Sequence, residues 1–370
     1  MAMRVLIAAG GTGGHIYPGI AVAKEIVRRD GGSRVRFVGT ARGLEKRLVP
    51  DAGFELSLIE SKGLKNVGLL GKVRGLLLLP KSFLAARRLI KEFRPDVVVG
   101  AGGYVSGPVL LMAAFMKVPT LVMDSNALPG FTNRVLARFV DGAAVTFEAA
   151  LPYFRGKGVV TGNPVRHEFF DIPPKSRTAA SFSLLIFGGS QGARGINLAM
   201  IEALSHLDAH RSELRVTHQT GELDYEMVHD AYLKAGWDAD VRRYITDMVT
   251  EFAQADLVIS RAGATTCAEL AASGKAAIMI PLPTAADDHQ RKNAEALEAE
   301  GAARVILQKD LTGELLAKEI TSLLQEPERV TRMEESSRKL ARNDAAGAAV
   351  EMIEKLGQRR QNTGHRKQDS

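Results

Sequence analysis

The sequence predicts an α/β protein with two doubly wound parallel-sheet domains. Short apolar runs alternate with segments of helical periodicity along most of the chain, which is the pattern of strands and helices in parallel sheets. An apolar run, a glycine-rich loop and a helical segment follow one another at residues 5–27 and again from residue 184. The length of 370 residues, at roughly 150 residues per domain, suits two domains with separate cores.

In the N-terminal half, the first expected strand covers residues 5–9, and a helix follows the glycine loop 10–14 from His15 onward. Its apolar residues recur at the spacing of the buried face of a helix. Further runs have the length and composition of buried parallel strands. They are residues 35–38, 97–99, 120–123 and 143–146.

In the C-terminal half, a strand is expected at residues 184–187, a glycine loop at 188–192 and a helix at 193–207. Further strands are expected at residues 215–218, 257–260, 276–280 and 303–307. Parallel sheets bind ligands at the carboxyl ends of their strands. We therefore expect two domains that face each other across a ligand-binding cleft.

A polar segment at residues 162–183, which contains Asn163-Pro164 and Pro173-Pro174, separates the two halves. We expect an N-terminal domain at residues 1–163 and a C-terminal domain at 164–345. A helix at residues 346–357 would pack back on the N-terminal domain. The polar residues 358–370 would form a disordered tail.

Composition restricts the class of protein and its compartment. Contents of 45% apolar and 25% charged residues are typical of a globular protein and exclude wholesale disorder. The single cysteine, Cys267, excludes an intramolecular disulfide and suits a reducing cytoplasm. The apolar run at residues 5–9 is too short for a signal peptide, and the longest run, 109–116, is too short to span a membrane.

Charge is distributed unevenly along the chain. Residues 1–166 contain 24 Lys and Arg against 11 Asp and Glu, a balance of +13, whereas the remainder contains 25 against 31, a balance of −6. A basic half beside an acidic half indicates an anionic partner that meets one domain. Nucleic acid, an anionic membrane and a phosphorylated substrate all fit this description.

Three glycine-rich loops follow expected strands, at residues 10–14, 100–108 and 188–192. Such a loop presents backbone N–H groups at a helix N-terminus, where the helix dipole favours a phosphate. For any single loop, a tight turn explains the glycines equally well. The first loop lacks the third glycine of a dinucleotide-binding fingerprint, and no P-loop motif is present. Nicotinamide, flavin and P-loop enzymes are therefore disfavoured.

A nucleoside site is indicated at residues 244–270. The stretch SRAGATTCAE at residues 260–269 predicts a strand-to-helix turn with hydroxyls and one carboxylate, Glu269, which can accept hydrogen bonds from a ribose diol. Residues 244–248 offer an apolar floor and backbone groups suited to a flat base. Taken alone, Glu269 fits a solvated helix residue better.

Six motifs, in order and spacing, resemble the MurG family of bacterial glycosyltransferases. They are GGTGGHI at 10–16, GGYVSGP at 102–108, GNPVR at 162–166, GGSQGAR at 188–194, SRAGATTCAE at 260–269 and DDHQRKNA at 287–294. The resemblance covers about residues 3–355. It implies the GT-B fold, in which two Rossmann-like domains bind a lipid-linked acceptor (N-terminal) and UDP-N-acetylglucosamine (C-terminal).

The same resemblance implies an activity. It is the inverting transfer of N-acetylglucosamine to the 4-hydroxyl of an undecaprenyl-diphosphate-linked N-acetylmuramyl-pentapeptide, a step of peptidoglycan synthesis that bears on cell shape and division. It implies no cofactor and no metal. The lone D-x-D motif, Asp238-Ala239-Asp240, lies in a polar stretch and is expected at the surface.

Site residues follow from the resemblance by motif position. Glu269 would hold the ribose, Ile245 and Met248 the uracil, and Arg166 and Ser190 the donor diphosphate. The complete implied donor set is Thr12, Gly13, Gly14, Asn126, Arg166, Ser190, Ile245, Met248, Thr265, Thr266, Glu269, His289 and Gln290. The implied acceptor set is Gly13, Gly14, His15, Gly103, Tyr104 and Ser106.

The sugar pocket would be lined by His289, Gln290 and Asn126. Here the sequence departs from the family pattern, which often has two glutamines in place of His289-Gln290 and Glu-Gln-Asn in place of residues 124–126. The catalytic base is expected to be His15, at the start of a helix whose dipole favours the neutral imidazole. A histidine that hydrogen-bonds the loop or a phosphate is the alternative for His15, and Asp124 is the second candidate base.

A membrane contact is indicated at residues 62–94, which hold nine Lys and Arg and one acidic residue, interleaved with apolar residues. Cations around an apolar stripe suit an anionic leaflet, although a core helix with a solvated basic face has the same pattern. A lipid-linked acceptor favours peripheral binding at the cytoplasmic face of the inner membrane. The expected membrane residues are Leu69, Leu70, Leu76, Leu79 and Phe83, with residues 115–117 as an extension.

Other functions remain open. A UDP-sugar transferase with another lipid acceptor, or a UDP-N-acetylglucosamine epimerase, would share the donor half but not the motifs at 10–16 and 102–108. A non-enzymatic module that docks on membranes or nucleic acid would leave Arg166, Ser190 and Glu269 unexplained. Nucleic acid is disfavoured because the basic segment 62–94 has only two aromatic residues on which bases could stack.

Overall fold

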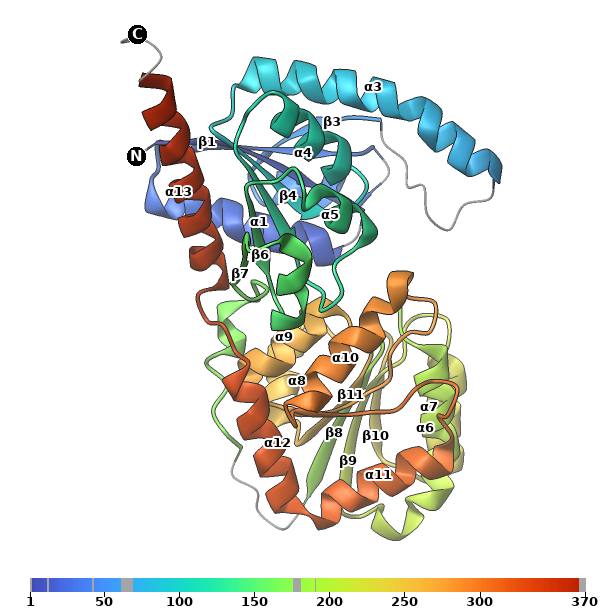
Figure 1. Ribbon diagram of the computed structural model, residues 1–370. Helices are drawn as coiled ribbons and strands as arrows, with labels where there is room; N and C mark the ends of the chain where they lie inside the picture. Colours follow the sequence, from blue (N-terminus) through green and yellow to red (C-terminus); the bar gives the residue numbers. More distant parts are fainter. Residues whose placement is uncertain are drawn as a thin grey trace. The chain divides into compact units, whose positions relative to one another are not determined.

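The computed structural model describes residues 2–11, 13–41, 43–60, 69–175, 181–189 and 191–365, without the side chains of residues 69–79 and 361–365. The chain forms two compact units (Figure 1). Unit 1 comprises Met1–Pro164 and Asp344–Ser370, and unit 2 comprises Val165–Asn343. The described part contains no helix with the length and hydropathy that a membrane span requires.

Unit 1 is built on a parallel sheet in the order β3-β2-β1-β4-β5-β6-β7. The direction of winding reverses between β1 and β4, so the loops that follow these two strands lie side by side at their carboxyl ends. The strands are β1 (Arg4–Ala9), β2 (Arg34–Gly39), β3 (Glu55–Leu58), β4 (Val97–Gly102), β5 (Thr120–Asp124), β6 (Gly142–Val145) and β7 (Gly158–Val160).

Helices cover both faces of this sheet (Figure 1). One face packs against α1, α2 and α13, and the other against α3, α4 and α5, each through a separate apolar core. These helices are α1 (Gly13–Arg29), α2 (Glu45–Asp51), α3 (Leu69–Phe93), α4 (Ser106–Phe115), α5 (Phe131–Leu136) and α13 (Ala345–His365); the short 3-10 helix η1 (Glu148–Phe154) precedes β7.

Unit 2 repeats the architecture with the order β10-β9-β8-β11-β12-β13, again parallel. Here the winding reverses between β8 and β11. The strands are β8 (Phe182–Phe187), β9 (Leu214–Gln219), β10 (Ala239–Arg242), β11 (Leu257–Ser260), β12 (Ala276–Met279) and β13 (Ala303–Val305).

The helices of unit 2 also form two layers. The apolar core under α6, α7 and α11 takes alternate strand residues such as Leu184 and Ile186, whereas Phe187 points to the opposite face and packs on Phe252 of α8. The elements are η2 (His167–Phe169), α6 (Arg194–His206), η3 (Asp208–His210), α7 (Tyr225–Lys234), α8 (Met248–Gln254), α9 (Ala264–Ser273), η4 (Ala286–Asp288), α10 (His289–Ala299), α11 (Gly313–Gln325) and α12 (Pro327–Lys339). The two doubly wound sheets confirm the predicted fold class.

Three strands, β3, β7 and β10, were not predicted. β3 and β7 form the two edges of the unit 1 sheet, and β10 forms one edge of the unit 2 sheet. Edge strands are short and half exposed, so they lack the continuous apolar runs by which buried parallel strands are recognised. Asp240 of the D-x-D motif therefore lies on an edge strand rather than in an irregular stretch, and its side chain is exposed.

The C-terminal helix also differs from expectation. It belongs to unit 1, where Arg29 of α1 binds Glu354 and the carbonyl of Gly347. It ends at His365 rather than at residue 357. Gln and Arg have high helix propensity, so the helix extends through residues whose polarity suggested disorder.

Candidate active site

The glycine loop after β8 is interlocked with the turn after β9. Gly189 and Gly192 have φ values of +88° and +72°, and a Cβ on Gly192 would overlap the carbonyl oxygen of Thr220. Only glycine allows this close approach of two backbones. The loop leads directly into α6, so its N–H groups lie at a helix N-terminus, where an anion binds favourably. Ser190, predicted to bind the diphosphate here, lies outside the described residues.

Gln219, which the sequence analysis missed, joins this loop to the segment predicted to hold the base. Its Nε2 donates to the Gly189 carbonyl at 2.8 Å, and its Oε1 accepts the Ile245 N–H at 2.8 Å. The side chain is buried. The Ile245 N–H therefore donates within the protein. The Ile245 carbonyl is the backbone group that can contact a nucleobase. Met248 lies three residues on, half-buried at the start of α8.

Glu269 lies on α9 and is half-buried. Its carbonyl accepts the Ser273 hydroxyl at 2.7 Å, whereas its carboxylate forms no hydrogen bond or ion pair with the described residues. Burial raises its pKa from 4.5 to about 7, and the positive charge of Arg166 partly opposes this shift. Arg166 is exposed, and its guanidinium lies 5.1 Å from the Phe169 ring centroid. A carboxylate and a cation thus lie together in unit 2, as the sequence predicted.

The N-terminus of α9 is open to a ligand. Gly263 is its N-cap residue and supplies no capping side chain, and no acidic residue lies in the first turn. The first backbone N–H groups of a helix have no partner within it, and the helix dipole makes this end positive. Thr265 and Thr266 lie in that turn, half exposed. Hydroxyls and N–H groups therefore lie one turn from Glu269.

The segment predicted to hold the sugar has a strained backbone. Asp287 and Asp288 have φ values of +56° and +54°, a conformation that costs about 1–3 kcal/mol for each non-glycine residue. The next two residues begin α10. His289 Nδ1 lies 2.7 Å from the Ala286 carbonyl, and Gln290 Oε1 accepts the Leu282 N–H at 3.0 Å. His289 and Gln290 are both half-buried.

In unit 1 the loops after β1 and β4 meet at the predicted acceptor site. Gly102 and Gly103 have φ values of +117° and +81°. A Cβ on Gly103 would overlap the Gly10 carbonyl, and one on Gly102 would overlap the ring of His15. His15 lies in the first turn of α1, half-buried against Gly102. The structure therefore brings the candidate base and the second glycine loop together.

The other predicted residues of unit 1 differ in accessibility. Gly13 and Gly14, the first two residues of α1, are half exposed, and Tyr104 is 58% exposed. Ser106 is fully buried, and its hydroxyl binds the carbonyls of Ala8 and Gly102 and the Gly102 N–H. Ser106 therefore joins the ends of β1 and β4 and does not reach a ligand. Thr12 lies outside the described residues.

Asp124, the second candidate base, is engaged within the protein. Its carboxylate accepts hydrogen bonds from the N–H groups of Asn126 and Gly130 at 3.0 and 3.1 Å and from Asn133 Nδ2 at 2.8 Å. Burial raises its pKa. It shapes the loop after β5 rather than facing a ligand. Asn126, in the same loop, is half-buried.

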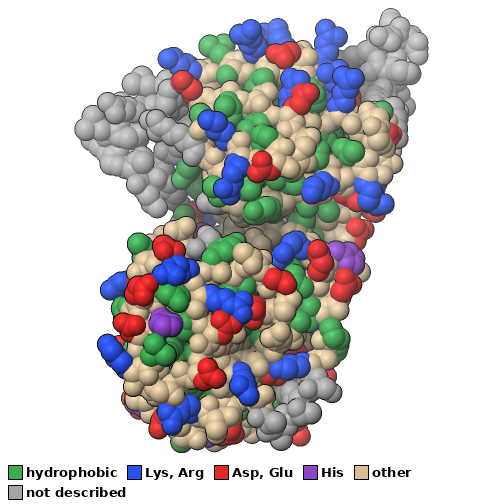
Figure 2. Space-filling view, turned by 180° about the vertical axis from the view of Figure 1, so that it is seen from behind, with side chains coloured by type: hydrophobic (Ala, Val, Ile, Leu, Met, Phe, Trp, Pro, Cys, Tyr) green, Lys and Arg blue, Asp and Glu red, His purple; other side chains and the backbone are tan. Residues whose placement is uncertain are grey.

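Of the five residues predicted to contact a membrane, the structure describes the side chain of one. The side chains of Leu69, Leu70, Leu76 and Leu79 lie outside the description, and Phe83 is half-buried. Exposed apolar residues of this region include Leu84 on α3 and Phe115 on α4, at 66% and 65% exposure, and Phe139, whose ring lies 6.3 Å from that of Phe115. Unit 1 as a whole carries 28 Lys and Arg against 15 Asp and Glu. Figure 2 shows many of these cations among apolar side chains on one face.

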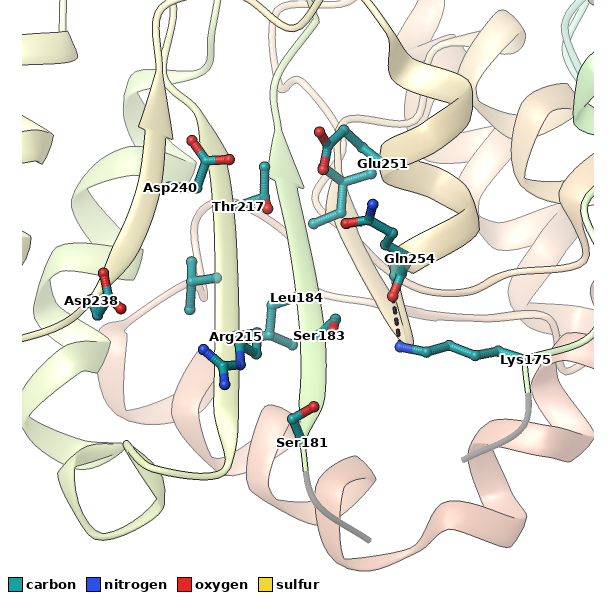
Figure 3. A pocket seen from close by; sticks show the side chains of 13 residues that line it. Lys175, Ser181, Ser183, Leu184, Arg215, Thr217, Asp238, Asp240, Glu251 and Gln254 are labelled. Atoms are coloured by element: carbon teal, nitrogen blue, oxygen red, sulfur yellow. Dashed lines mark hydrogen bonds between the residues drawn. The ribbon is translucent and has the colours of Figure 1, made fainter. Parts of the chain in front are cut away.

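A groove of about 480 Å³ lies elsewhere in unit 2 (Figure 3). It is lined by Ser183 and Arg215 at the amino ends of β8 and β9, and by residues of β10 and α8. Lys175 crosses its edge and donates to the Gln254 carbonyl at 2.6 Å. The glycine loop and Glu269 follow the carboxyl ends of the strands, so the groove is not part of the candidate site. Within the described ranges, no group of three His, Cys, Asp or Glu side chains could hold a metal ion.

Comparisons with known proteins show the family of the chain. Residues 5–145 match the glycosyltransferase family 28 N-terminal domain, and residues 183–351 match its C-terminal domain. A UDP-N-acetylglucosamine–N-acetylmuramyl-(pentapeptide) pyrophosphoryl-undecaprenol N-acetylglucosamine transferase from Anaeromyxobacter sp. (strain Fw109-5) is 49% identical, with 97% of this chain and 94% of that protein covered.

Solved structures extend the comparison. The crystal structure of Acinetobacter baumannii MurG has a TM-score of 0.82 and 33% identity, covering 95% of this chain and 99% of its own. A putative UDP-N-acetylglucosamine 2-epimerase from Listeria monocytogenes has a TM-score of 0.70 at 14% identity, covering 95% and 96%, and shares the fold alone. The predicted GT-B fold is confirmed. The chain belongs to glycosyltransferase family 28 and, within it, to the MurG family.

Proposed function

We propose that this chain transfers N-acetylglucosamine from UDP-N-acetylglucosamine to an undecaprenyl-diphosphate-linked N-acetylmuramyl-pentapeptide. The full-length identity to transferases named for this reaction supports the choice of both substrates. The observation that carries the proposal is the pair formed by Glu269 and Arg166, a carboxylate with no hydrogen bond to the described chain and an exposed cation whose charge lowers the pKa of that carboxyl. A nucleoside diphosphate sugar supplies both complements, a ribose diol and a diphosphate.

Unit 2 would bind the donor. Glu269 would accept hydrogen bonds from the ribose hydroxyls, and the Ile245 carbonyl would accept the N3–H of uracil. The N-termini of α6 and α9, with Arg166, would bind the diphosphate and stabilise the charge that grows on UDP as it leaves. His289 and Gln290 would contact the sugar.

Unit 1 would bind the acceptor at the two glycine loops. The N–H groups of Gly13 and Gly14 at the start of α1 would bind its diphosphate. The 4-hydroxyl of the muramyl sugar would attack the anomeric carbon of N-acetylglucosamine, the bond from that carbon to the UDP oxygen would break, and His15 would take the hydroxyl proton. Attack opposite the leaving group inverts the anomeric configuration.

UDP release tests the reaction. With UDP-N-acetylglucosamine and detergent-solubilised acceptor, the chain should release UDP only when both are present. His15→Gln, which still fills the space against Gly102, should lower kcat about 100-fold or more and leave the KM for the donor unchanged. His206→Ala, at an exposed histidine of α6, is the matched control and should act like the wild type.

Other outcomes would replace the proposal. Acceptor-independent conversion of UDP-N-acetylglucosamine to an epimer would favour the epimerase reaction. Donor binding with turnover on a different lipid acceptor would keep the donor site but reject the pentapeptide substrate. Full activity of His15→Gln would reject His15 as the base.

We also propose that unit 1 binds an anionic membrane surface at the cytoplasmic face of the inner membrane, where a lipid-linked acceptor must be met. Leu84 and Phe115 are the exposed apolar residues that support this, and Arg87, Arg88 and Lys91 lie on the same helix as Leu84. Burial of apolar side chains and attraction of cations to anionic headgroups act together in such contacts.

A further inference from the structure

A buried carboxylate lies beneath the first glycine loop of unit 1. Glu45 is the first residue of α2, and its side chain is fully buried. It lies among turns from two parts of the chain, the loop after β1 and the loop after β2. Carboxylates are rarely buried unless paired with a cation or hydrogen-bonded on all sides. Within the described part of the chain, the Glu45 carboxylate is held by hydrogen bonds from Gly11 and Thr40.

Three donors from those two loops bind this carboxylate. Oε2 accepts the Gly11 N–H at 3.0 Å, and Oε1 accepts the N–H and the hydroxyl of Thr40, both at 2.8 Å. The backbone adds a bond from the Leu44 N–H to the Gly11 carbonyl at 3.3 Å. Burial acts to raise the pKa of Glu45, but the hydrogen bonds from Thr40 and Gly11 together outweigh it, so the pKa lies below its usual value and the carboxylate is ionised at neutral pH. The loop after β1 is thus tied to the loop after β2 through one side chain.

The space around Glu45 is made by glycines. A Cβ on Gly43 would overlap the carboxylate, one on Gly39 would lie 2.5 Å from its Cγ, and one on Gly10 would lie 3.0 Å from Oε1. Side chains at these positions would displace the carboxylate. The two loops therefore leave a space that matches the Glu45 side chain, and glycines are required to form it.

The hydrogen bond to Gly11 restricts how the loop can bind an anion. Loops of this kind bind phosphates through successive backbone N–H groups. The Gly11 N–H already donates to Glu45, and the negative charge of Glu45 lies on that side of the loop. The Gly11 N–H is therefore not available to an incoming diphosphate, whereas Gly13 and Gly14, the residues that lead into His15, are half exposed.

We propose that Glu45 is a positioning residue that fixes the turn from β1 into α1, and thereby aims Gly13, Gly14 and His15 at the acceptor. This rests on the proposed function, in which the acceptor binds at this loop. Glu45 touches neither substrate and acts through the Gly11 N–H. No metal or further ligand is required.

Glu45→Gln tests the assignment with little change in shape. The glutamine amide has one oxygen and one NH₂ group. The NH₂ group would face an N–H donor and could not accept a hydrogen bond from it. An unmade buried hydrogen bond of this kind corresponds to about a tenfold effect. We expect the KM for the lipid-linked acceptor to rise about tenfold at saturating donor. The KM for UDP-N-acetylglucosamine should stay constant, because the proposed function assigns Gly13 and Gly14 to the acceptor and the donor to unit 2.

Controls separate this role from a purely structural one. Glu55→Gln removes an exposed carboxylate from the same unit and should leave both KM values unchanged. If Glu45 only stabilised unit 1, Glu45→Gln would lower the fraction of active enzyme, and hence kcat, with both KM values unchanged. That result would overturn the proposal. If Glu45→Gln does not fold, Thr40→Val removes one donor to the carboxylate and should raise the acceptor KM about threefold.

A readout without turnover keeps the test independent of the proposed reaction. Hydrogen exchange of the peptide containing Gly11, Gly13 and Gly14 should become at least about tenfold faster in Glu45→Gln, with exchange in unit 2 unchanged. Unchanged exchange in this peptide would overturn the positioning role. If the wild type shows no acceptor-dependent turnover while the exchange prediction holds, the proposed substrate fails and the role of Glu45 in fixing the loop stands.

Discussion

At the scale of single residues, Glu269 links donor binding to pH. Its pKa is raised to about 7 because burial disfavours the charged form. The ionised carboxylate is the form that accepts two ribose hydroxyls. The affinity for UDP-N-acetylglucosamine should therefore fall as the pH drops below 7, by about tenfold for each pH unit once protonation dominates.

The donor KM measured between pH 5.5 and 8 checks this prediction. Glu269→Gln should bind donor more weakly at pH 8 and should lose the pH dependence. Glu300→Gln, an exposed glutamate of the same unit, should keep the wild-type profile. A flat wild-type profile over this range would contradict the role of Glu269.

The same pKa shift has a consequence for stability without donor. Because the folded state holds the proton between pH 4.5 and about 7 while the unfolded state has released it, unit 2 loses stability as the pH rises through this window. Glu269→Gln should raise the unfolding midpoint at pH 8 by about 3 °C. Calorimetry at pH 5 and pH 8 checks the direction of this change in stability. The part of the change that comes from Glu269 should be absent in the variant.

Arg166 acts on Glu269 as well as on the diphosphate. Its charge lowers the pKa of the carboxyl, so Arg166→Ala should move the pH profile of donor binding to higher pH. It should also raise the donor KM about tenfold by removing a charge-assisted contact. Arg332→Ala, at an exposed arginine of α12, is the control. An unchanged pH profile of donor binding in Arg166→Ala would contradict an action of Arg166 on Glu269.

At the scale of elements, the donor site depends on loops being held in register. Gln219 ends β9 and bonds both the glycine loop and Ile245. Gln219→Met removes both bonds and leaves the buried Ile245 N–H without the acceptor it has in the wild type, which should raise the donor KM about tenfold or more. The acceptor KM should be unaffected. Gln325→Met, at the exposed end of α11, is the control, and equal donor KM values for the two variants would reject the role of Gln219.

The sequence predicts the central strands better than the edge strands, and the reason is physical. Central strands such as β4 and β11 are buried on both faces and read as continuous apolar runs. The edge strand β10 has the sequence ADVR and shows no such run. Gln219 and Glu45 were missed because their roles depend on loops from distant parts of the chain, which composition and spacing do not bring together.

Motifs predicted which residues gather at the strand ends but not how each side chain is used. Glu269 lies on α9, the helix after β11, and His15 lies in the first turn of α1, the helix after β1. Ser106 belongs to an equally clear motif and Asp124 follows a predicted strand, yet hydrogen bonds to nearby backbone engage both. A hydroxyl or carboxylate next to a tight turn can satisfy that turn instead of a ligand, and sequence spacing does not separate the two uses.

At the scale of the whole molecule, the uneven charge predicts where a membrane binds. Leu84→Asp with Phe115→Asp should reduce co-flotation with vesicles containing anionic lipid by about tenfold, because two apolar contacts become charged. Leu223→Asp changes a residue of unit 2 that is 93% exposed and should float like the wild type. High salt should weaken binding of the wild type. Equal flotation of all three proteins would place the membrane contact elsewhere.

The central claim concerns the reaction, and the product tests it most directly. The chain would be incubated with UDP-N-acetylglucosamine and undecaprenyl-diphosphate-linked N-acetylmuramyl-pentapeptide, and the lipid product examined by mass spectrometry and NMR. The account predicts one added N-acetylhexosamine per UDP released, joined to the 4-hydroxyl in the inverted, β configuration. Release of UDP with free sugar, an epimerised donor or an unmodified acceptor would contradict it.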